Sequence, residues 1–341
     1  MDHKQYYGLK YLVTVLVVVL SCAAASAQQE LAAVAAAGHL KENLSLPKPA
    51  LPKGRAEKQQ LLDMLKGLNI PNVPDNESDN RQWTRLAQVF THFRMYPLAM
   101  KCFLKTLPAD SLVNDSIQVT AGDKHAFEDQ LKKIGYTAKP VSCPIIKTDH
   151  IINTFRDGKR AMAYAMILHV KQPVRGTRKV HKLANTGHTF ITLIKFNTDS
   201  SYAAFSFGFG PDKDNLFAAT PLVPTSSSKF TNDGGHEWDE VVGKFISRHR
   251  FERILRLTKQ YDGLAYNLST NNCTDFGLEA ARLAGVVIED TKSKWLMGEG
   301  NSPATTGESI LLGKFSNTDT MNQSQLFIDT VRDNSVTIKS Q

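Results

Sequence analysis

The sequence lacks several patterns that would place it in a common functional class. It contains no His-Glu-x-x-His motif, and His181 and His236 are not spaced as metal ligands, so we expect no zinc centre. No basic run is interleaved with aromatic residues, so the sequence gives no support for a nucleic-acid partner. Neither internal repeats nor heptads occur, which argues against repeat and coiled-coil architectures. No sequence feature indicates a cofactor.

An apolar run lies near the start of the chain, and no other segment approaches transmembrane length. Lys4 and Lys10 precede an apolar stretch over residues 11–20, and small residues ending in Ala25-Ser26-Ala27 follow. This is the three-part layout of a secretory signal. The stretch is shorter than the about 20 apolar residues that span a bilayer, so we expect no transmembrane span in the mature chain. We therefore predict a signal peptide over residues 1–27 and favour cleavage after Ala27.

A second interpretation of the same segment is a lipid anchor. Val19-Leu20-Ser21-Cys22 resembles a loose bacterial lipobox, in which Cys22 would be acylated, although its Leu lies one place later than usual. Cleavage after Ala27 instead lowers the net charge from +8 to +7, because residues 1–27 carry a net +1. A basic protein suits a cell-wall polymer or lipid headgroups, but ordinary solubilising charge explains the balance equally well. We expect an exported protein of a bacterial periplasm or cell surface, either free or as a lipoprotein.

Cysteine is scarce, and its count is informative. The four cysteines are Cys22, Cys102, Cys143 and Cys273, and cleavage after Ala27 leaves three. An odd number of thiols in an oxidising compartment indicates an unpaired cysteine. Cys102 and Cys143 can pair and leave Cys273 free. The alternative is three buried thiols that pack as small hydrophobic groups.

The order of patterns along the chain predicts an α+β fold. Residues 28–55 are rich in Ala and then in Pro and Gly, which is typical of a linker. Residues 56–145 have apolar side chains at helical spacing and predict a mostly helical accessory region. Residues 146–315 predict the main domain. Residues 316–341 predict a polar C-terminal tail, with one weakly amphipathic stretch over 325–331.

Within the main domain, β-type patterns predict several strands. The strands predicted over 188–196 and 202–209 form a hairpin around the turn cluster Asn197-Thr198-Asp199-Ser200. Residues 211–237 are rich in Pro, Ser, Asn and Gly and predict a loop. A helix is expected over 250–261 and another from about Cys273. The predicted strands are residues 161–170, 188–196, 202–209 and 241–246.

The residues around Cys273 predict a nucleophile at a helix N-terminus. Polar residues before it, up to Asn272, are good N-caps, and an apolar face that begins at Phe276 follows before Gly285 ends the helix. Peptide N–H groups and the positive end of the helix dipole favour a thiolate there. A thiolate is the nucleophile of cysteine hydrolases, and the same N–H groups can stabilise a developing oxyanion.

A thiolate needs a proton acceptor, and His188 is the best candidate. Gly187-His188-Thr189-Phe190 places this His at the start of a strand, where it is held rigidly and can face a helix that packs on the sheet. A lone His is usually a structural residue and a lone Cys is usually inert. The combination of the two at element starts predicts a Cys–His pair.

These two motifs, in this order, resemble the circularly permuted branch of the papain-like, NlpC-like thiol hydrolases. This branch includes cell-envelope amidases and lecithin retinol acyltransferase-like enzymes. The matching segments are Gly187-His188-Thr189-Phe190-Ile191 and Asn271-Asn272-Cys273-Thr274-Asp275-Phe276, and the resemblance covers roughly residues 160–310. It implies that Cys273 is the nucleophile and His188 the general base, and that a barrel-like antiparallel sheet packs on the helix bearing the Cys.

The resemblance also implies a third polar residue that orients the His from the following strand. In residues 202–209, only Ser206 offers a side-chain hydrogen bond within the strand, and Tyr202 lies at its start. Neither has the His, Asn, Gln or Glu side chain typical of the family. Asp275, Asp239 or a backbone carbonyl are alternatives, and a Cys–His dyad is another.

The sequence therefore predicts an exported cysteine-dependent hydrolase of an amide or ester bond. The compartment and the resemblance favour a peptidoglycan peptide as the substrate over a lipid. One alternative is a non-catalytic envelope protein that uses the same fold to bind a ligand or partner. Another is a secreted toxin or effector with the same chemistry.

Overall fold

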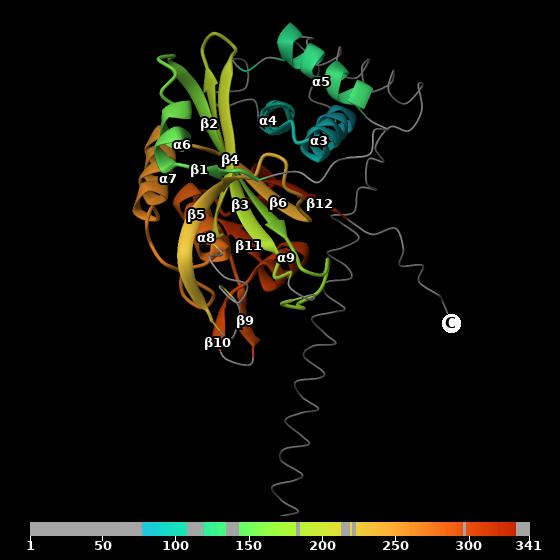
Figure 1. The fold of residues 1–341 in the computed structure, drawn as a ribbon. Helices are drawn as coiled ribbons and strands as arrows, with labels where there is room; N and C mark the ends of the chain where they lie inside the picture. The colour runs from blue at the N-terminus through green and yellow to red at the C-terminus, as the bar shows by residue number, and fades with distance from the viewer. Residues whose placement is uncertain are drawn as a thin grey trace, which may run out of the picture. The chain divides into compact units, whose positions relative to one another are not determined.

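The computed structural model describes residues 77–107, 117, 119–133, 143–181, 185–212, 219, 223–295 and 298–331. An antiparallel sheet, in which seven strands pair one after another, organises this part of the chain. The strand order is β1-β5-β4-β3-β2-β6-β12, and β7 also pairs with β5 (Figure 1). The strands are β1 (Ile145–Ile146), β2 (Ala161–Lys171), β3 (His188–Asn197), β4 (Tyr202–Asp212), β5 (Thr225–Asn232), β6 (Glu240–Ile246), β7 (Tyr266–Asn267) and β12 (Phe327–Thr330).

The α+β class is confirmed, but the expected barrel-like sheet is wrong. The sheet is open, since no pairing among the described strands joins β12 back to the β1 and β5 side. A closed barrel needs a continuous ladder around its circumference. Here β1 is only two residues long and pairs only near the end of β5, so it offers too little edge for closure.

The four predicted strands correspond to β2, β3, β4 and β6. The predicted hairpin is β3–β4, with Ile191 opposite Phe207 and Phe196 opposite Tyr202. In β2 the continuous apolar run is explained by burial on both faces. Met166 and Leu168 belong to one core cluster, and Ala165 and Ile167 belong to the other.

Two of the strands that the sequence did not predict form in segments assigned to a loop and to a polar tail. β5 lies inside the predicted loop over residues 211–237, and β12 lies inside the predicted polar tail. The pattern of β5 is mostly Ser, Thr and Lys, and only Phe230 is buried in it, so backbone pairing with β4 sustains the strand. β12 pairs with β6, so the main domain extends past residue 315.

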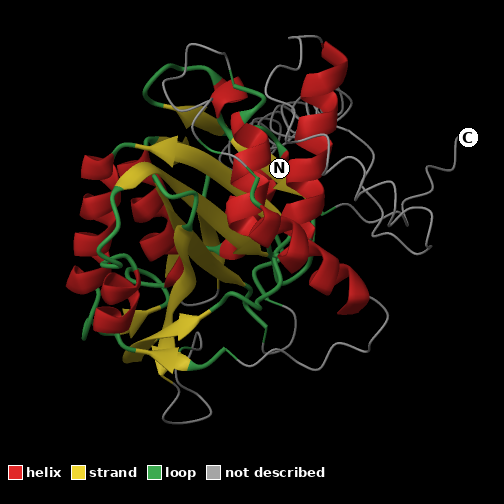
Figure 2. Ribbon diagram, turned by 90° about the horizontal axis from the view of Figure 1, so that it is seen from above, coloured by secondary structure: helices red, strands yellow, loops and turns green. Residues whose placement is uncertain are grey.

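Helices cover both faces of the sheet (Figure 2). One core cluster combines β-strand side chains with α6 (Thr148–Thr154), α7 (Arg248–Gln260) and α8 (Cys273–Ala284). The other combines the opposite face with α3 (Glu77–His92), α4 (Tyr96–Leu104) and α5 (Ala121–Lys133). The expected helices over 250–261 and from about Cys273 are α7 and α8.

The N-terminal expectations fall partly outside this description. The signal peptide, Cys22, the linker over 28–55 and the first part of the accessory region lie outside the described residues. Three helices, α3 to α5, account for most of the described part of residues 56–145. All described residues belong to one compact unit, Lys48–Gln341. None of the helices described is long and apolar enough to cross a membrane.

Short elements complete the domain after α8. β8 (Val286–Ile288) pairs with β11 (Phe315–Asn317), and β9 (Lys292–Trp295) pairs with β10 (Gly298–Asn301). α9 (Pro303–Leu311) begins after the N-cap Ser302, and a 3-10 turn, η1 (Gln323–Gln325), precedes β12.

Candidate active site

Cys273 is the first residue of α8, at an N-terminus that is capped from both sides. The Asn272 side chain accepts hydrogen bonds from the backbone N–H groups of Thr274 at 2.7 Å and Asp275 at 3.1 Å. In return, Asp275 accepts one from the Asn272 N–H at 2.8 Å, which completes a capping box. Cys273 is only 6% exposed. The thiol is therefore held at the positive end of the helix dipole and largely removed from water.

His188 occupies the start of β3 and is fixed by its neighbours. Gly187 has φ +77°, and a Cβ there would lie 2.8 Å from Cδ of Pro173 and 2.9 Å from Cβ of Pro303. Only glycine fits this backbone conformation and this space. The His188 ring stacks on Phe190, with centroids 5.8 Å apart. Its side chain is 17% exposed.

Asp233 binds the His188 ring. Nε2 of His188 lies 3.0 Å from Oδ2 of Asp233, whose side chain is 1% exposed. Thr231 donates a hydrogen bond to the other carboxylate oxygen at 3.0 Å, and the Asp233 N–H donates to the Ser206 carbonyl at 3.0 Å. The carboxylate is thus anchored to β5 and β4 and aimed at the start of β3.

Gly208 makes room for this contact. A Cβ at Gly208 would lie 2.6 Å from His188 Nε2 and closer still to Oδ2 of Asp233. Real Cβ contacts essentially never fall below 3.0 Å. The His188–Asp233 hydrogen bond therefore passes over a position on β4 that has no side chain.

The pKa shifts of His188 and Cys273 favour an ion pair between the two side chains. Burial disfavours a charged His188, but hydrogen bonds to Asp233 and Cys273 outweigh burial and raise the pKa of His188 to about 10. Burial also disfavours a Cys273 thiolate. Its hydrogen bond to His188 and the positive charge of that ring reverse the effect, so the pKa of Cys273 is lowered from its usual value. Imidazolium and thiolate stabilise each other.

Two threonines join the strand that carries His188 to the helix that carries Cys273. Thr189 Oγ1 lies 3.2 Å from Thr274 Oγ1 in a fully buried contact. The Thr189 backbone also hydrogen-bonds Cys273 and contributes to the lowered pKa of its thiol. Gly277 allows this close approach, since a Cβ there would lie 2.5 Å from Cγ2 of Thr189.

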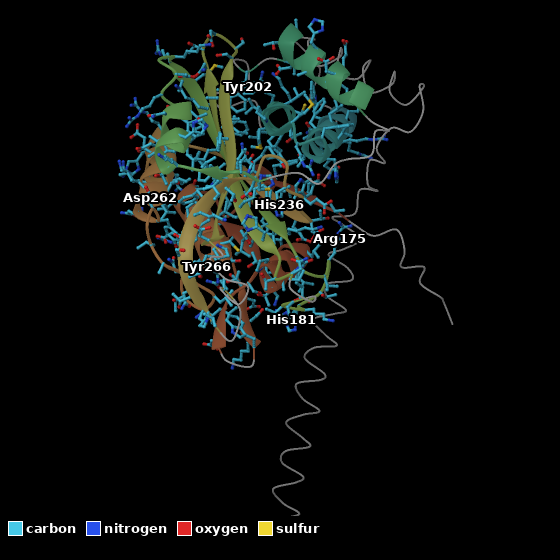
Figure 3. All side chains as sticks on the ribbon, in the orientation of Figure 1. Arg175, His181, Tyr202, His236, Asp262 and Tyr266 are labelled. Atoms are coloured by element: carbon cyan, nitrogen blue, oxygen red, sulfur yellow. The ribbon has the colours of Figure 1, made fainter. Side chains whose placement is uncertain are left out.

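Tyr266 and His236 complete the surroundings of the pair (Figure 3 labels both). Tyr266, in β7, hydrogen-bonds both the side chain and the backbone of Cys273, and burial with the nearby thiolate raises the pKa of its hydroxyl well above the usual value. The His236 ring lies 4.9 Å from that of His188. Burial and the charge of His188 lower the pKa of His236, so this second imidazole is neutral at pH 7.

The structure places the other sequence candidates away from this contact. The Ser206 hydroxyl bonds Thr192 Oγ1 at 2.7 Å. Asp275 is occupied by the Asn272 N–H and by the Asn301 side chain at 2.7 Å. Asp239 accepts hydrogen bonds from the Lys171 side chain at the end of β2 and, in the segment after β2, from the Gln172 backbone and the Arg175 side chain.

The sequence analysis missed Asp233 because it assigned residues 211–237 to a loop. A signal was present, since the turn cluster Asn232-Asp233-Gly234-Gly235 begins two residues after the apolar Phe230. Recognising a strand before this turn would have placed Asp233 directly after the end of β5. The partners of β5 are β4, β1 and β7, which residue patterns alone do not specify.

Among the described residues, Cys102 and Cys143 are both free thiols, so the pairing that the sequence left open is not present. Cys102 is buried, and burial raises the pKa of its thiol well above the usual value. Burial and the carboxylate of Asp233, which the Cys143 side chain hydrogen-bonds, raise the pKa of Cys143 to about 11. In the part of the chain that the structure describes, no group of three or more His, Cys, Asp or Glu residues is arranged to hold a metal ion.

Comparison with known proteins gives no match to a family model, to a curated protein or to a solved structure.

Proposed function

We propose that this chain is an exported cysteine-dependent hydrolase of an amide or ester bond, built as a permuted papain-like domain. Cys273 is the nucleophile, His188 the general base and acid, and Asp233 the residue that orients His188. The observation that carries the proposal is the arrangement of three side chains. Asp233 binds the His188 ring at 3.0 Å, and His188 lies near enough to Cys273 for each to shift the pKa of the other. Nucleophile, base and orienting group are the parts that covalent hydrolysis needs.

In the first half-reaction, the Cys273 thiolate attacks the substrate carbonyl carbon and forms a C–S bond. The tetrahedral intermediate collapses as the bond to the leaving nitrogen or oxygen breaks, and the His188 imidazolium gives its proton to that atom. A thioester on Cys273 and a neutral His188 remain. Asp233 holds Nε2, so the other ring nitrogen faces the reaction.

In the second half-reaction, a water molecule attacks the thioester. Neutral His188 takes a proton from this water as the new C–O bond forms. The C–S bond then breaks, which releases the acid product and restores the thiolate–imidazolium pair.

The developing oxyanion has two candidate donors beside Cys273. One is the Cys273 backbone N–H at the first turn of α8, from which the substrate oxygen would accept a hydrogen bond in place of the Tyr266 hydroxyl, and the other is the Tyr266 hydroxyl itself. Because the pKa of Tyr266 is raised, its hydroxyl stays protonated and can donate. Both are fixed before substrate binds.

The substrate class follows from the expected compartment and from the resemblance of the motifs. A peptide of the cell wall is favoured over a lipid ester or amide. The burial of Cys273 favours one alternative, a non-catalytic envelope protein that binds a ligand or partner on the same fold. In that case Cys273→Ser would leave the cellular role intact.

Limited labelling with iodoacetamide across pH tests the chemistry before any substrate is known. Peptide mapping locates the label among Cys102, Cys143 and Cys273. We expect Cys273 to react first, well below the ordinary thiol pKa of about 8.5, and His188→Ala to abolish this advantage. A Cys273 that stays unlabelled, or that reacts as an ordinary thiol in both proteins, would contradict the proposal. Turnover of wall peptides and of lipid esters then separates the substrate classes.

A further inference from the structure

A large cleft lies far from Cys273, at the end of the sheet where β2 begins and β3 and β6 end. It has a volume of about 1130 Å³, and α6, α7 and the segment between α6 and β2 line it. Lys195 lines the cleft, and it is seven residues along β3 from His188. At about 3.3 Å per residue, this spacing corresponds to roughly 23 Å. The cleft is therefore a separate feature from the candidate active site.

The lining of the cleft is strongly basic. Its charged residues comprise seven cations and two acids, which are Asp149 and Glu252. Three of the cations are neutralised by ion pairs, namely Lys159 with Asp199, Lys195 with Asp157 and Arg248 with Glu252. The other four are exposed and form no ion pair within the described part of the chain: Arg156, Arg160, Arg256 and Lys259.

These four cations line the cleft from two segments of the chain. Arg156 and Arg160 flank the turn at Gly158, which has φ +72° and reverses the chain between α6 and β2. Arg256 and Lys259 lie one turn apart on α7, on the stripe that also carries Glu252 into the cleft. Guanidinium groups bind phosphate oxygens in a bidentate manner, and unpaired guanidinium groups from two elements can bind one phosphate together.

Between the cations the cleft is apolar. Five large, partly buried apolar side chains line it, in addition to the buried Phe155 and Phe251. A free anion or a water-soluble acidic polymer would use the cations and leave this surface in contact with water. A ligand with both an anionic group and an apolar part matches the whole lining. The five side chains are Ile152, Met162, Tyr164, Phe245 and Leu255.

We propose that this cleft binds the headgroup of an anionic phospholipid. The phosphate contacts the unpaired guanidinium groups, and the adjoining glycerol and acyl carbons lie on the apolar surface. The protein would thus dock on a membrane through the end of the sheet opposite His188 and Cys273. The proposal does not rest on the hydrolase function, since the two sites share no residue.

Vesicle co-sedimentation of the full chain tests the proposal. The probes are vesicles of phosphatidylcholine alone and vesicles with about one fifth phosphatidylglycerol. The cleft variant combines Arg156→Gln, Arg160→Gln, Arg256→Gln and Lys259→Gln. A control variant removes the same charge from exposed positions outside the cleft, with Arg85→Gln, Arg253→Gln, Arg282→Gln and Lys294→Gln.

The wild-type chain should bind phosphatidylglycerol vesicles more tightly than neutral ones. Each basic residue near an anionic surface contributes about fivefold, so the cleft variant should lose at least about tenfold in affinity. The control variant should lose much less. Equal losses in both variants would show that net charge alone drives binding and would overturn the proposal. Unchanged Cys273 labelling in the cleft variant verifies that it is folded.

Two further arms test the apolar part of the cleft and the source of the phosphate. Leu255→Asn leaves the charge unchanged and should still weaken binding to phosphatidylglycerol vesicles. Short-chain phosphatidylglycerol should bind the wild-type chain in titration calorimetry, and inorganic phosphate should bind far more weakly. Equal binding of phosphate, or preference for an acidic peptide, would replace the lipid with another anion. Cys273→Ser should bind lipid like the wild type, so failure of the hydrolase proposal would leave this result intact.

Discussion

At the scale of single residues, Asp233 is the side chain that orients His188 in the proposed mechanism. Its side chain is almost fully buried, and its Oδ2 lies 3.0 Å from Nε2 of His188. A neutral amide of the same shape can keep a hydrogen bond to the ring, but it cannot stabilise the positive charge. Orientation and electrostatic support can therefore be separated by one substitution.

We expect Asp233→Asn to lower turnover by about 10²-fold, the lower range for positioned acid–base groups, and to slow Cys273 labelling near neutral pH. Ser206→Ala is the matched control. Ser206 was the sequence candidate for the same role, but its hydroxyl bonds Thr192 rather than His188, so its loss should leave labelling unchanged. Labelling and hydrolysis rates for both variants check the assignment. The reverse pattern would restore Ser206 as the orienting residue.

The thiolate–imidazolium pair also predicts a pH window for activity. The pKa of Cys273 is lowered and that of His188 is raised to about 10, so both charges coexist between the two values. Rising pH creates the thiolate as it passes the lower pKa. It removes the proton that His188 gives to the leaving group as it passes about 10. We expect kcat/KM to rise on the acid side and to fall above about pH 10.

The acid limb of this profile has its own control. In His188→Gln, the cation that stabilises the thiolate is absent, so the labelling rate should rise only near or above the ordinary thiol pKa of about 8.5. An acid limb that stays in place in this variant would mean that the helix N-terminus, rather than His188, lowers the pKa of Cys273.

At the scale of secondary-structure elements, β4 contributes a position without a side chain, Gly208, which leaves room for the His188–Asp233 contact. Gly208→Ala would place a methyl group between His188 and Asp233. The ring and the carboxylate must then move apart, so we expect the fast labelling of Cys273 to be lost and stability to fall by about 1–3 kcal/mol. Gly210→Ala, two residues along the same strand, meets nothing within 4 Å and should change neither. Chemical denaturation and labelling of both variants test the difference.

Elements with strong periodicity could be predicted from the sequence, and elements held by pairing could not. β2 and β3 carry apolar side chains that fill both cores, and α8 has an N-cap, an apolar face and a terminal glycine, so each pattern specifies its own element. β5 has almost no apolar pattern and exists because β4 and β1 complete its hydrogen bonds. The same distinction divides the candidate site. Cys273 and His188 lie on α8 and β3, which their own residue patterns predict. Asp233 follows β5, which forms through pairing with its neighbours.

At the scale of the whole molecule, β12 forms one edge of the open sheet and packs into the core. Phe327 is almost fully buried between β6 and α4, where its ring centroid lies 5.5 Å from that of Phe103. It joins the end of the chain to the helices that precede the main domain. The C-terminal strand is thus part of the core, which its polar sequence did not suggest.

We expect Phe327→Ala to lower the free energy of unfolding by about 3–5 kcal/mol, because it removes a large buried side chain and leaves a cavity. Ile328→Ala, on the opposite face of the same strand, is half-buried and should cost less. Thermal and denaturant unfolding of the two variants measures the difference. Equal effects would mean that β12 contributes through backbone pairing alone.

The candidate site is assembled from three segments that are far apart in the chain, around His188, Asp233 and Cys273. In an unfolded polypeptide, Cys273 has neither the helix nor the imidazolium, and its thiol has an ordinary pKa. A precursor kept unfolded for translocation would therefore be chemically silent in the compartment where it is made. If the protein is exported and hydrolytic, as proposed, folding after export would itself be the activation step.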